Sequence, residues 1–391
     1  MSDSNRIRVS IVPESTFGVT PATPAFQVLA TTGVSLRDRI GYQQSATINN
    51  DRNVQDLIRL SKAAGGGVPM ELTWSPSGEG LMQLVKAAMA GAETAAVSVA
   101  PVTTAGGDKI ISRATGSFVS DGFEVGDIVR TYGSVIPGNH GYFKVTVVAS
   151  GALTVEADAN FAADATGDLE VVRGARIKNG TVETFFTIEV AYLDLDKARL
   201  FTGCAVDGLD FTIADQAVTT ANFGFQSASS SFVNASIGSP GIFITGATYT
   251  VPTVSPVLDA IGVPEIRSQG VAYAAKSVNM SILNNVAPRT QIGGLGAQSM
   301  RFGEFGASGR ITAFHEDFTE LTAYASNTAT DLWLVMIDEN SKGFSLSFPQ
   351  VKYSDAGADV SGSNTDILLD LAATAIKDPV ELITARLQRW N

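Results

Sequence analysis

Residues able to perform chemistry are scarce in this sequence and are not grouped in a catalytic pattern. The chain has two histidines, His140 and His315, and one cysteine, Cys204. A nucleophilic triad needs an imidazole beside a nucleophile, and a structural zinc site needs several Cys or His ligands. His140 lies in a glycine-rich turn, and neither histidine has a partner that suggests a triad. We therefore expect no catalytic residue, no metal site and no cofactor.

Two pairs of carboxylates remain as candidates for acid–base chemistry or calcium binding. Asp194 and Asp196 form one pair, and Glu316 and Asp317 form the other. Aspartate in such turns commonly caps a following helix, which favours a structural role. The segment GGLGAQS, residues 293–299, lacks the third glycine and the Gly-Lys-Ser/Thr of phosphate-binding loops, and we interpret it as a flexible turn.

Composition predicts a globular protein made mainly of β-structure. Of 391 residues, 45% are apolar and 17% charged, and the 38 glycines together with many Thr, Val and Ser favour short strands joined by tight turns. The net charge of −12 disfavours binding to nucleic acid or anionic lipid through basic patches. No apolar run is long enough to span a membrane and no signal peptide is recognisable, so we expect synthesis and assembly in a cytoplasm.

Two segments are predicted to reach beyond the core. Residues 1–29 are proline-containing and are predicted to form an N-terminal arm, which is either frayed or lies on a neighbouring subunit. Residues 41–66 are polar and longer than ordinary connections. We expect both to bury little apolar area against their own domain. Their apolar side chains are the predicted contacts with a neighbouring subunit: Phe17, Phe26 and Leu29 in the arm, and Leu57, Ile58 and Leu60 in the loop.

A helix and a small inserted domain follow. Apolar residues from Leu81 to Met89 recur at helical spacing and Gly91 is the predicted stop. Residues 92–174 are predicted to form a small five-stranded β-barrel, because short alternating strands are separated by Gly-rich turns. Acids outnumber bases there, which favours a packing or decorating module over a nucleic-acid binder. We expect this barrel to be dispensable for assembly.

An internal repeat predicts duplication of one structural unit. At a constant offset of 123 residues, Ile188 aligns with Ile311, Asp194 with Asp317, and Phe201 with Tyr324. Upstream, GGGVPMELTW also resembles GASGRITAF. The first module is then 30–91 plus 175–255 and the second is 256–391, with chance similarity between two β-rich segments as the alternative.

Several stretches, in order, resemble the major tail tube proteins of long-tailed, non-contractile bacteriophages, of the type with a duplicated tube domain. They are PESTFGVTPATPAF, LATTGVSL, DRNVQDLIRLSKAAGGGVPMELTW, GARIKNGTVETFFTIEVAYLDLDKARLFTGCAVDGLDFTI and GRITAFHEDFTELTAYASNTATDLWLVMIDENSKGFSLSFPQVKY. The resemblance covers most of residues 11–391 apart from the inserted barrel.

This resemblance implies a fold of two tandem β-sandwich or barrel modules with short helices. It implies a non-enzymatic virion protein that forms stacked rings around a channel for genome ejection, located in the tail and assembled in the host cytoplasm. Three chains would supply six modules in a trimeric pseudo-hexameric ring, with a true hexamer as the alternative. The implied partners are further copies, the tape measure protein, double-stranded DNA bound without sequence specificity, and the tail tip and tail terminator proteins.

The acidic residues have a candidate role in such a channel, because a wall without clustered positive charge would let DNA slide. Glu71, Glu189 and Asp210 lie in predicted strands and are the candidates to face the channel. Two other classes stay open at this stage. One is a head-decoration or receptor-binding virion protein, and the other is a glycan hydrolase, which would need a close carboxylate pair in a cleft.

Overall fold

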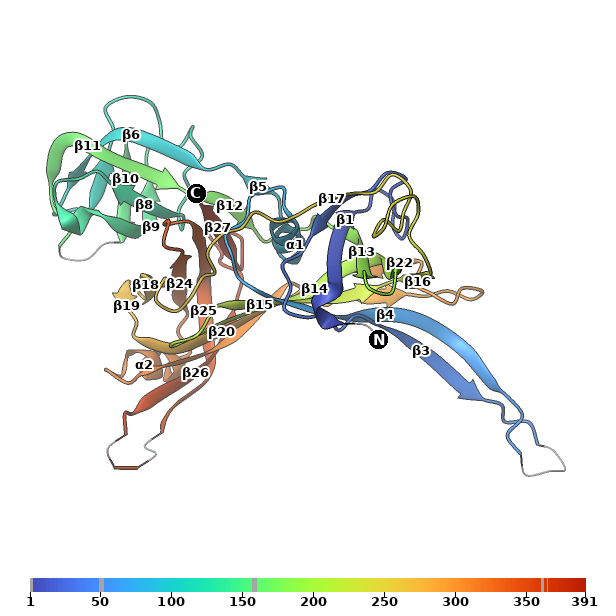
Figure 1. Ribbon diagram of the computed structural model, residues 1–391. Helices are drawn as coiled ribbons and strands as arrows, with labels where there is room; N and C mark the ends of the chain where they lie inside the picture. The colour runs from blue at the N-terminus through green and yellow to red at the C-terminus, as the bar shows by residue number, and fades with distance from the viewer. Residues whose placement is uncertain (1–2, 49–52, 157–159, 360–361, 364) are drawn as a thin grey trace.

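The computed structural model describes residues 3–391 apart from 49–52, 157–159, 360–361 and 364. Within them the chain is mainly β, as predicted, with two α-helices and two short 3-10 turns at Ser4–Arg6 and Pro137–Asn139. Figure 1 shows two sheet-bearing halves, a barrel beside one of them, and a long hairpin that leaves the other.

The first module is one antiparallel sheet of order β3-β4-β15-β14-β13-β1. Its strands are β1 (Ile7–Pro13), β3 (Arg37–Gln44), β4 (Leu57–Glu71), β13 (Phe185–Tyr192), β14 (Lys197–Ala214) and β15 (Thr220–Ser227). Three more strands join it: β2 (Ala25–Val28) on β1, β16 (Ser229–Val233) on the first half of β14, and β17 (Thr248–Thr250) on β2.

The second module has the order β20-β23-β26-β25-β24-β18. Its strands are β18 (Glu265–Ser268), β20 (Ala275–Leu283), β23 (Gly306–Phe314), β24 (Thr330–Ile337), β25 (Gly343–Asp359) and β26 (Leu368–Ala375). It also holds β19 (Val271–Ala272) on β18, β27 (Arg386–Trp390) on the first half of β25, and the hairpin of β21 (Ala287–Arg289) and β22 (Ser299–Arg301).

The two modules repeat the same unit. In each, a two-stranded unit (β3-β4 or β20-β23) precedes a helix, and three further strands complete the sheet in the same order. The helices are α1 (Gly80–Ala88) and α2 (Thr319–Ala325). In module one, the start of β14 pairs with β16, which follows β15 in the chain. In module two, the start of β25 pairs with β27, which follows β26.

The residue alignment predicted for this repeat is wrong. Phe201 is fully buried in strand β14, whereas Tyr324 is 39% exposed on helix α2. By topology β13 corresponds to β24 and not to β23, and β4 corresponds to β23. The upstream similarity of GGGVPMELTW to GASGRITAF therefore does match two corresponding strands, β4 and β23. The inserted barrel separates α1 from β13 and has no counterpart in the second module, which makes a single constant offset impossible.

Each sheet buries one face, because apolar and polar residues alternate along its strands. In the second half of β14, Leu209, Phe211 and Ile213 are buried, while Asp210 and Thr212 between them are exposed. Helix α1 covers the buried face with its apolar stripe, as predicted. Gly91 after it lies so close to β12 (Ala175–Lys178) that an added Cβ would come within 2.0 Å of the Lys178 carbonyl oxygen.

The inserted domain is a closed barrel of six strands, in the order β10-β7-β6-β11-β8-β9, with its own apolar core. Its strands are β6 (Val97–Ala105), β7 (Ile110–Ser112), β8 (Ile128–Tyr132), β9 (Gly141–Val148), β10 (Ala152–Glu156) and β11 (Asp164–Arg173). The predicted number of five is wrong because β6 went unrecognised. Pro101 interrupts its alternating valines, and proline inside a run argues against a strand.

The expected N-terminal arm packs on its own module instead of leaving it. Strand β1 pairs with β13 over its whole length, from Ile7 opposite Tyr192 to Pro13 opposite Phe186. Phe26 is fully buried and stacks on Tyr249 with ring centroids 5.4 Å apart. The expectation that this segment buries little apolar area is therefore wrong.

The predicted long loop 41–66 is for the most part an extended hairpin. Strands β3 and β4 pair from Arg37 opposite Gly65 to Gln44 opposite Leu57, with a bulge at Tyr42. The hairpin projects well beyond the rest of the module (Figure 1). The sequence did not indicate these strands because the outer half of the hairpin exposes both faces. Apolar and polar residues therefore do not alternate there with the two-residue period of a half-buried strand.

We predict that Phe26→Ala lowers the free energy of unfolding by about 3–5 kcal/mol, the usual cost of truncating a buried aromatic side chain. Val19→Ala is the control, because Val19 lies in the same segment and is 55% exposed; it should cost about 0.5 kcal/mol or less. Urea denaturation followed by circular dichroism measures both. Equal stability of the two variants would show that the segment does not dock.

Candidate assembly interface

The residues that could do chemistry are held in structural roles. His140 has Nε2 2.7 Å from the Ser134 carbonyl oxygen, and the His315 ring packs edge-on against Phe318. Burial raises the pKa of the Cys204 thiol to about 12, which removes it as a nucleophile at neutral pH. Among the described residues no group of three or more His, Cys, Asp or Glu side chains is arranged to hold a metal ion.

The carboxylate pairs bond to nearby backbone. Asp317 accepts a hydrogen bond from the N–H of Thr319, the first residue of α2, and that bond lowers the pKa of Asp317. Asp317 thus satisfies a free N–H at the start of the helix, but it precedes the N-cap residue, Phe318, which makes no side-chain capping bond. Asp194 and Asp196 accept hydrogen bonds from the N–H groups of Asp3 and Ser236, and a strand rather than a helix follows them.

The feature that can act on another molecule is a set of sheet edges. The second half of β14 pairs with β20 over seven residues, from Gly208 opposite Leu283 to Ala214 opposite Ser277. We call this pairing the internal seam. It joins the sheet of module one to the sheet of module two in the continuous order β3-β4-β15-β14-β20-β23-β26-β25.

The two ends of this continuous sheet are open. Strand β3 pairs with β4 only, and the second half of β25, from Lys352 onward, pairs with β26 only, within the described part of the chain. Such edges carry unpaired backbone N–H and C=O groups that can accept another strand. Strand β3 is the counterpart of β20, and β25 is the counterpart of β14. The open edges are therefore the same two kinds of edge that already meet at the internal seam.

One face of this continuous sheet is polar and solvent-exposed across both modules. We call it the polar face, and strand register allows its rows to be traced from β4 to β25. One row is Glu71, Thr220, Thr212, Asn279, Arg310, Ala372 and Asp355, and the next is Asn222, Asp210, Ser281, Ser308, Thr374 and Lys352. Small hydroxyl and amide side chains dominate these rows, and the few charges are of both signs.

Two of the three acidic residues predicted to face a channel lie on the polar face. Glu71 and Asp210 are exposed there, and Asp210 accepts a hydrogen bond of 2.6 Å from the Ser281 hydroxyl across the internal seam. The prediction for Glu189 is wrong. Its carboxylate is fully buried, where it pairs with Arg8 at 2.8 Å and accepts a 2.8 Å hydrogen bond from Tyr249.

The predicted contact residues also divide into two groups. Leu57, Ile58 and Leu60 are 59%, 46% and 54% exposed on the outer half of the hairpin. Phe26 and Leu29 are buried in module one, and Phe17 is half-buried against Phe185 with ring centroids 4.9 Å apart. These three aromatic and aliphatic side chains of the N-terminal segment are therefore covered by their own chain.

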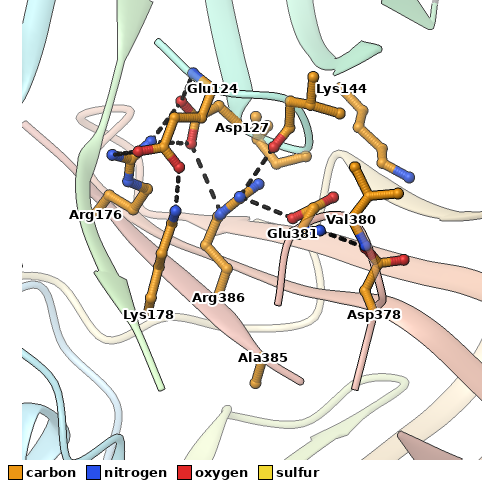
Figure 2. Close-up of polar contacts among 12 residues, drawn as sticks. Glu124, Asp127, Lys144, Arg176, Lys178, Asp378, Val380, Glu381, Ala385 and Arg386 are labelled. Carbon is orange, nitrogen blue, oxygen red and sulfur yellow. Dashed lines mark hydrogen bonds and ion pairs between the residues drawn. The ribbon is translucent and has the colours of Figure 1, made fainter. Parts of the chain in front are cut away.

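A buried ionic cluster, which sequence reasoning missed, fixes the barrel across both modules (Figure 2). Both carboxylate oxygens of Asp127 in the barrel accept hydrogen bonds from Nη1 of Arg176, at 2.9 and 2.8 Å. Nε of Arg386 lies 3.7 Å from Oδ1 of the same carboxylate. Arg176 belongs to β12 (Ala175–Lys178), which pairs with β27 of module two and with β5 (Glu93–Thr94) at the barrel entry. Three segments distant in sequence thus meet at one carboxylate.

Further contacts continue this joint, which we call the barrel brace. Tyr142 packs edge-on against Trp390 at 5.3 Å, and Gln388 exchanges two hydrogen bonds with the backbone of Ile128 at 2.7 and 3.0 Å. Lys144 pairs with Asp331 of β24. Deleting 92–174 would uncover these side chains, and the dispensability of the barrel for assembly stays a prediction.

These features define a class of protein. The described residues offer open sheet edges, a polar face and a projecting hairpin, which is the pattern of a structural assembly protein. No helix of the described residues combines the length and apolarity needed to cross a membrane.

A family model described as phage tail tube protein matches residues 4–375, nearly the whole chain. The chain therefore belongs to the phage tail tube protein family and is a structural component of the bacteriophage tail. This confirms the family resemblance found in the sequence. No curated protein matches the chain.

We predict that Asp127→Asn lowers the free energy of unfolding by about 3–5 kcal/mol, because it leaves Arg176 and Arg386 without their shared buried counter-charge. Asp370→Asn is the control, since the Asp370–Arg310 pair is exposed (41% and 60%) and should be worth about 0–1 kcal/mol. Denaturant titration measures both. A loss at Asp127 no larger than that at Asp370 would show that the barrel brace is not a stabilising joint.

The same cluster predicts a pH dependence at Glu124. Burial opposes its ionisation, but the hydrogen bond from Lys178 and the charges of Arg176, Lys178 and Arg386 outweigh this, so the pKa of Glu124 lies below its usual 4.5. The stabilisation is present above pH 4.5 and is lost as the pH falls through the folded-state pKa. Burial raises the pKa of nearby Glu381, which has the opposite effect.

Glu124→Gln isolates the first contribution. The wild-type protein should be more stable than this variant at pH 6, and the difference should shrink as the pH falls toward 3. Thermal denaturation at stepped pH measures it. A difference that stays constant over this range would contradict the assignment.

Proposed function

We propose that this chain is the repeating subunit of a tail tube, in which copies join edge to edge into rings and the rings stack around a channel that conducts the genome. One observation carries the proposal. The internal seam already joins β14 to β20, and the chain leaves the corresponding edges, β25 and β3, open at the two ends of the same sheet. Pairing β25 of one copy with β3 of the next repeats the internal seam between copies.

Such a join is head-to-tail, because the two edges differ, and head-to-tail interfaces generate closed rings when the rotation closes. In a closed ring every edge is paired, which removes the exposed strands that otherwise aggregate. Three copies would place six modules around the ring, which is the pseudo-hexameric arrangement favoured here. Six copies with twelve modules is the alternative.

The polar face is the proposed channel wall. Its rows are built mainly from Ser, Thr and Asn, and its charges are of mixed sign, with Arg310 paired to Asp370 at 2.7 Å. Double-stranded DNA carries one negative charge per roughly 1.7 Å, so a wall with clustered bases would retain it by many contacts. A wall of hydroxyls with Glu71 and Asp210 among them would let DNA and the tape measure protein pass without specific binding.

The projecting hairpin is the proposed contact between rings. Leu57, Ile58 and Leu60 expose apolar area in the free subunit, and burying each one fully would contribute about 1.5–3 kcal/mol before the ordering cost. The gain per subunit is modest and multiplies over a ring, which suits growth of a tube from a tail tip to a tail terminator protein. This assembly would take place in the host cytoplasm and leave the protein in the virion tail.

We predict that concentrated wild-type protein forms rings and tubes visible by negative-stain electron microscopy. Leu57→Ser combined with Ile58→Ser should leave folded protein that forms rings but few long tubes. Val254→Ser combined with Ile261→Ser is the control, because these side chains are 99% and 92% exposed in the segment between the modules; tube length should not change. Absence of any ring from the wild type would refute the proposed function. Normal tubes from the hairpin variant would refute only the stacking role.

A further inference from the structure

The open edges carry opposite charges at positions that the internal seam places opposite each other. Resting on the proposed function, we propose that neighbouring copies join in one register, with Arg39 of one copy opposite Asp355 of the next and Arg37 beside the same carboxylate. The partner is a second copy of this chain, and the ion pairs select head-to-tail joining.

The first step is the correspondence between β14 and β25. Strand β14 pairs with β15 with a register shift between Val206 and Gly208. Strand β25 pairs with β26 with a register shift between Tyr353 and Asp355. The irregularity falls at the same point of the repeat in both modules, which aligns Gly208 with Asp355.

The partner strands support this alignment. Strands β15 and β26 both have eight residues, with buried side chains at the same alternate positions. Leu209 pairs with Phe223 in module one. The aligned residues Ala356 and Leu371 pair in module two, where Leu371 is likewise fully buried.

The second step is the correspondence between β3 and β20. At the ends of β15 and β26, Ser227 pairs with Ala64 and Ala375 pairs with Ala307, so Ala64 aligns with Ala307. Across the next pairing, Asp38 lies opposite Ala64 and Ile282 lies opposite Ala307. Asp38 therefore aligns with Ile282, which places Arg39 at the position of Leu283 and Arg37 at that of Ser281.

The residues just before β3 agree with this alignment. It sets Val34 and Leu36 against Val278 and Met280 of β20. Leu36, Val278 and Met280 are buried, and Val34 packs against the same core. The apolar residues on the inward side are thus in phase, which a slip by one residue would destroy.

Transferring the internal seam to the open edges then fixes the pairs. Gly208 opposite Leu283 becomes Asp355 opposite Arg39, and Asp210 opposite Ser281 becomes Gly357 opposite Arg37. Directly opposed side chains in an antiparallel pair have Cβ atoms about 4.5–5.5 Å apart, and diagonal neighbours lie within reach of long side chains. Arg39 would meet Asp355 directly, and Arg37 would reach it diagonally.

The free chain leaves these charges available. Arg37, Arg39 and Asp355 are exposed, and none of them has an ion pair among the described residues. Arg310 acts on Asp355 electrostatically from the same sheet, but it is itself bonded to Asp370 at 2.7 Å. The pairs also exclude wrong joins. Two β3 edges would oppose arginine to arginine, and two β25 edges would oppose aspartate to aspartate, and both arrangements repel.

Charge reversal tests the pairing. Arg39→Asp and Asp355→Arg should each raise the concentration needed for ring formation by about tenfold or more, since like charges in contact cost several kcal/mol. The double reversal should restore assembly at least in part, and the effects should weaken at high salt. Arg289→Asp, on an exposed position of β21, is the control and should assemble like the wild type.

Cross-linking tests the register independently of affinity. Arg39→Cys combined with Asp355→Cys, treated with a short bis-maleimide after assembly, should give covalent multimers that end at one closed size. The matched pair Asp210→Cys and Ser281→Cys spans the internal seam and should cross-link within one chain. The only native cysteine, Cys204, is buried.

The outcomes separate this inference from the proposed function. Wild-type rings without multimers from the 39/355 pair, and without rescue by the double reversal, would overturn the register and leave ring formation standing. Failure of the wild type to form rings would instead remove the proposed function on which the register rests. Multimers together with rescue would establish both.

Discussion

The backbone hydrogen bonds between β14 and β20 are the interaction on which the rest of the molecule depends. They turn two sheets of the same topology into one, and so place the polar residues of both modules on one continuous face. A single β-sheet edge is a liability in a soluble protein. Here the internal seam consumes one edge of each kind and leaves one of each kind open. In the proposed ring, each contact between copies would repeat a contact that the fold already makes.

The barrel brace meets a second constraint, which is that the relative position of the modules must hold while edges are exposed. The barrel is inserted in the sequence of module one, but it contacts β24 and β27 of module two through Lys144, Tyr142 and Asp127. A buried carboxylate shared by two arginines is a weak source of net stability but is costly to disrupt. Such a joint favours one geometry over others, which is what a repeating subunit needs.

Charge distinguishes the internal seam from the seam that we propose between copies. Inside the chain, the seam needs no electrostatic selection because β14 and β20 are covalently connected, and it carries neutral pairs such as Gly208 with Leu283. In the proposed ring, strands of different copies meet by diffusion, and a wrong edge would compete with the right one. The opposite charges that we propose to pair would discriminate between these edges at little cost in solubility, since the same residues are exposed in the free subunit.

Sequence by itself determined the features that depend only on composition and on local periodicity. The β-rich class, the amphipathic helix from Leu81 to Met89, the presence of an inserted barrel and the family resemblance all follow from residue types and short-range spacing. The existence of a duplicated unit was also visible. Its alignment was not, because alternating strands resemble one another in sequence, and only their pairing shows that β13 corresponds to β24 and not to β23.

Tertiary structure alone decided which strands pair and what covers each side chain. Phe26 lies in the segment predicted to be an arm, and it is buried against Tyr249, more than two hundred residues away in the chain. Glu189 lies in a predicted strand, and it is buried with Arg8, more than one hundred residues away. Arg176, Asp127 and Arg386 meet only when three distant segments converge. Long-range contacts of this kind leave no period in the sequence, because the free energy that selects them comes from burial and charge pairing between elements rather than within one.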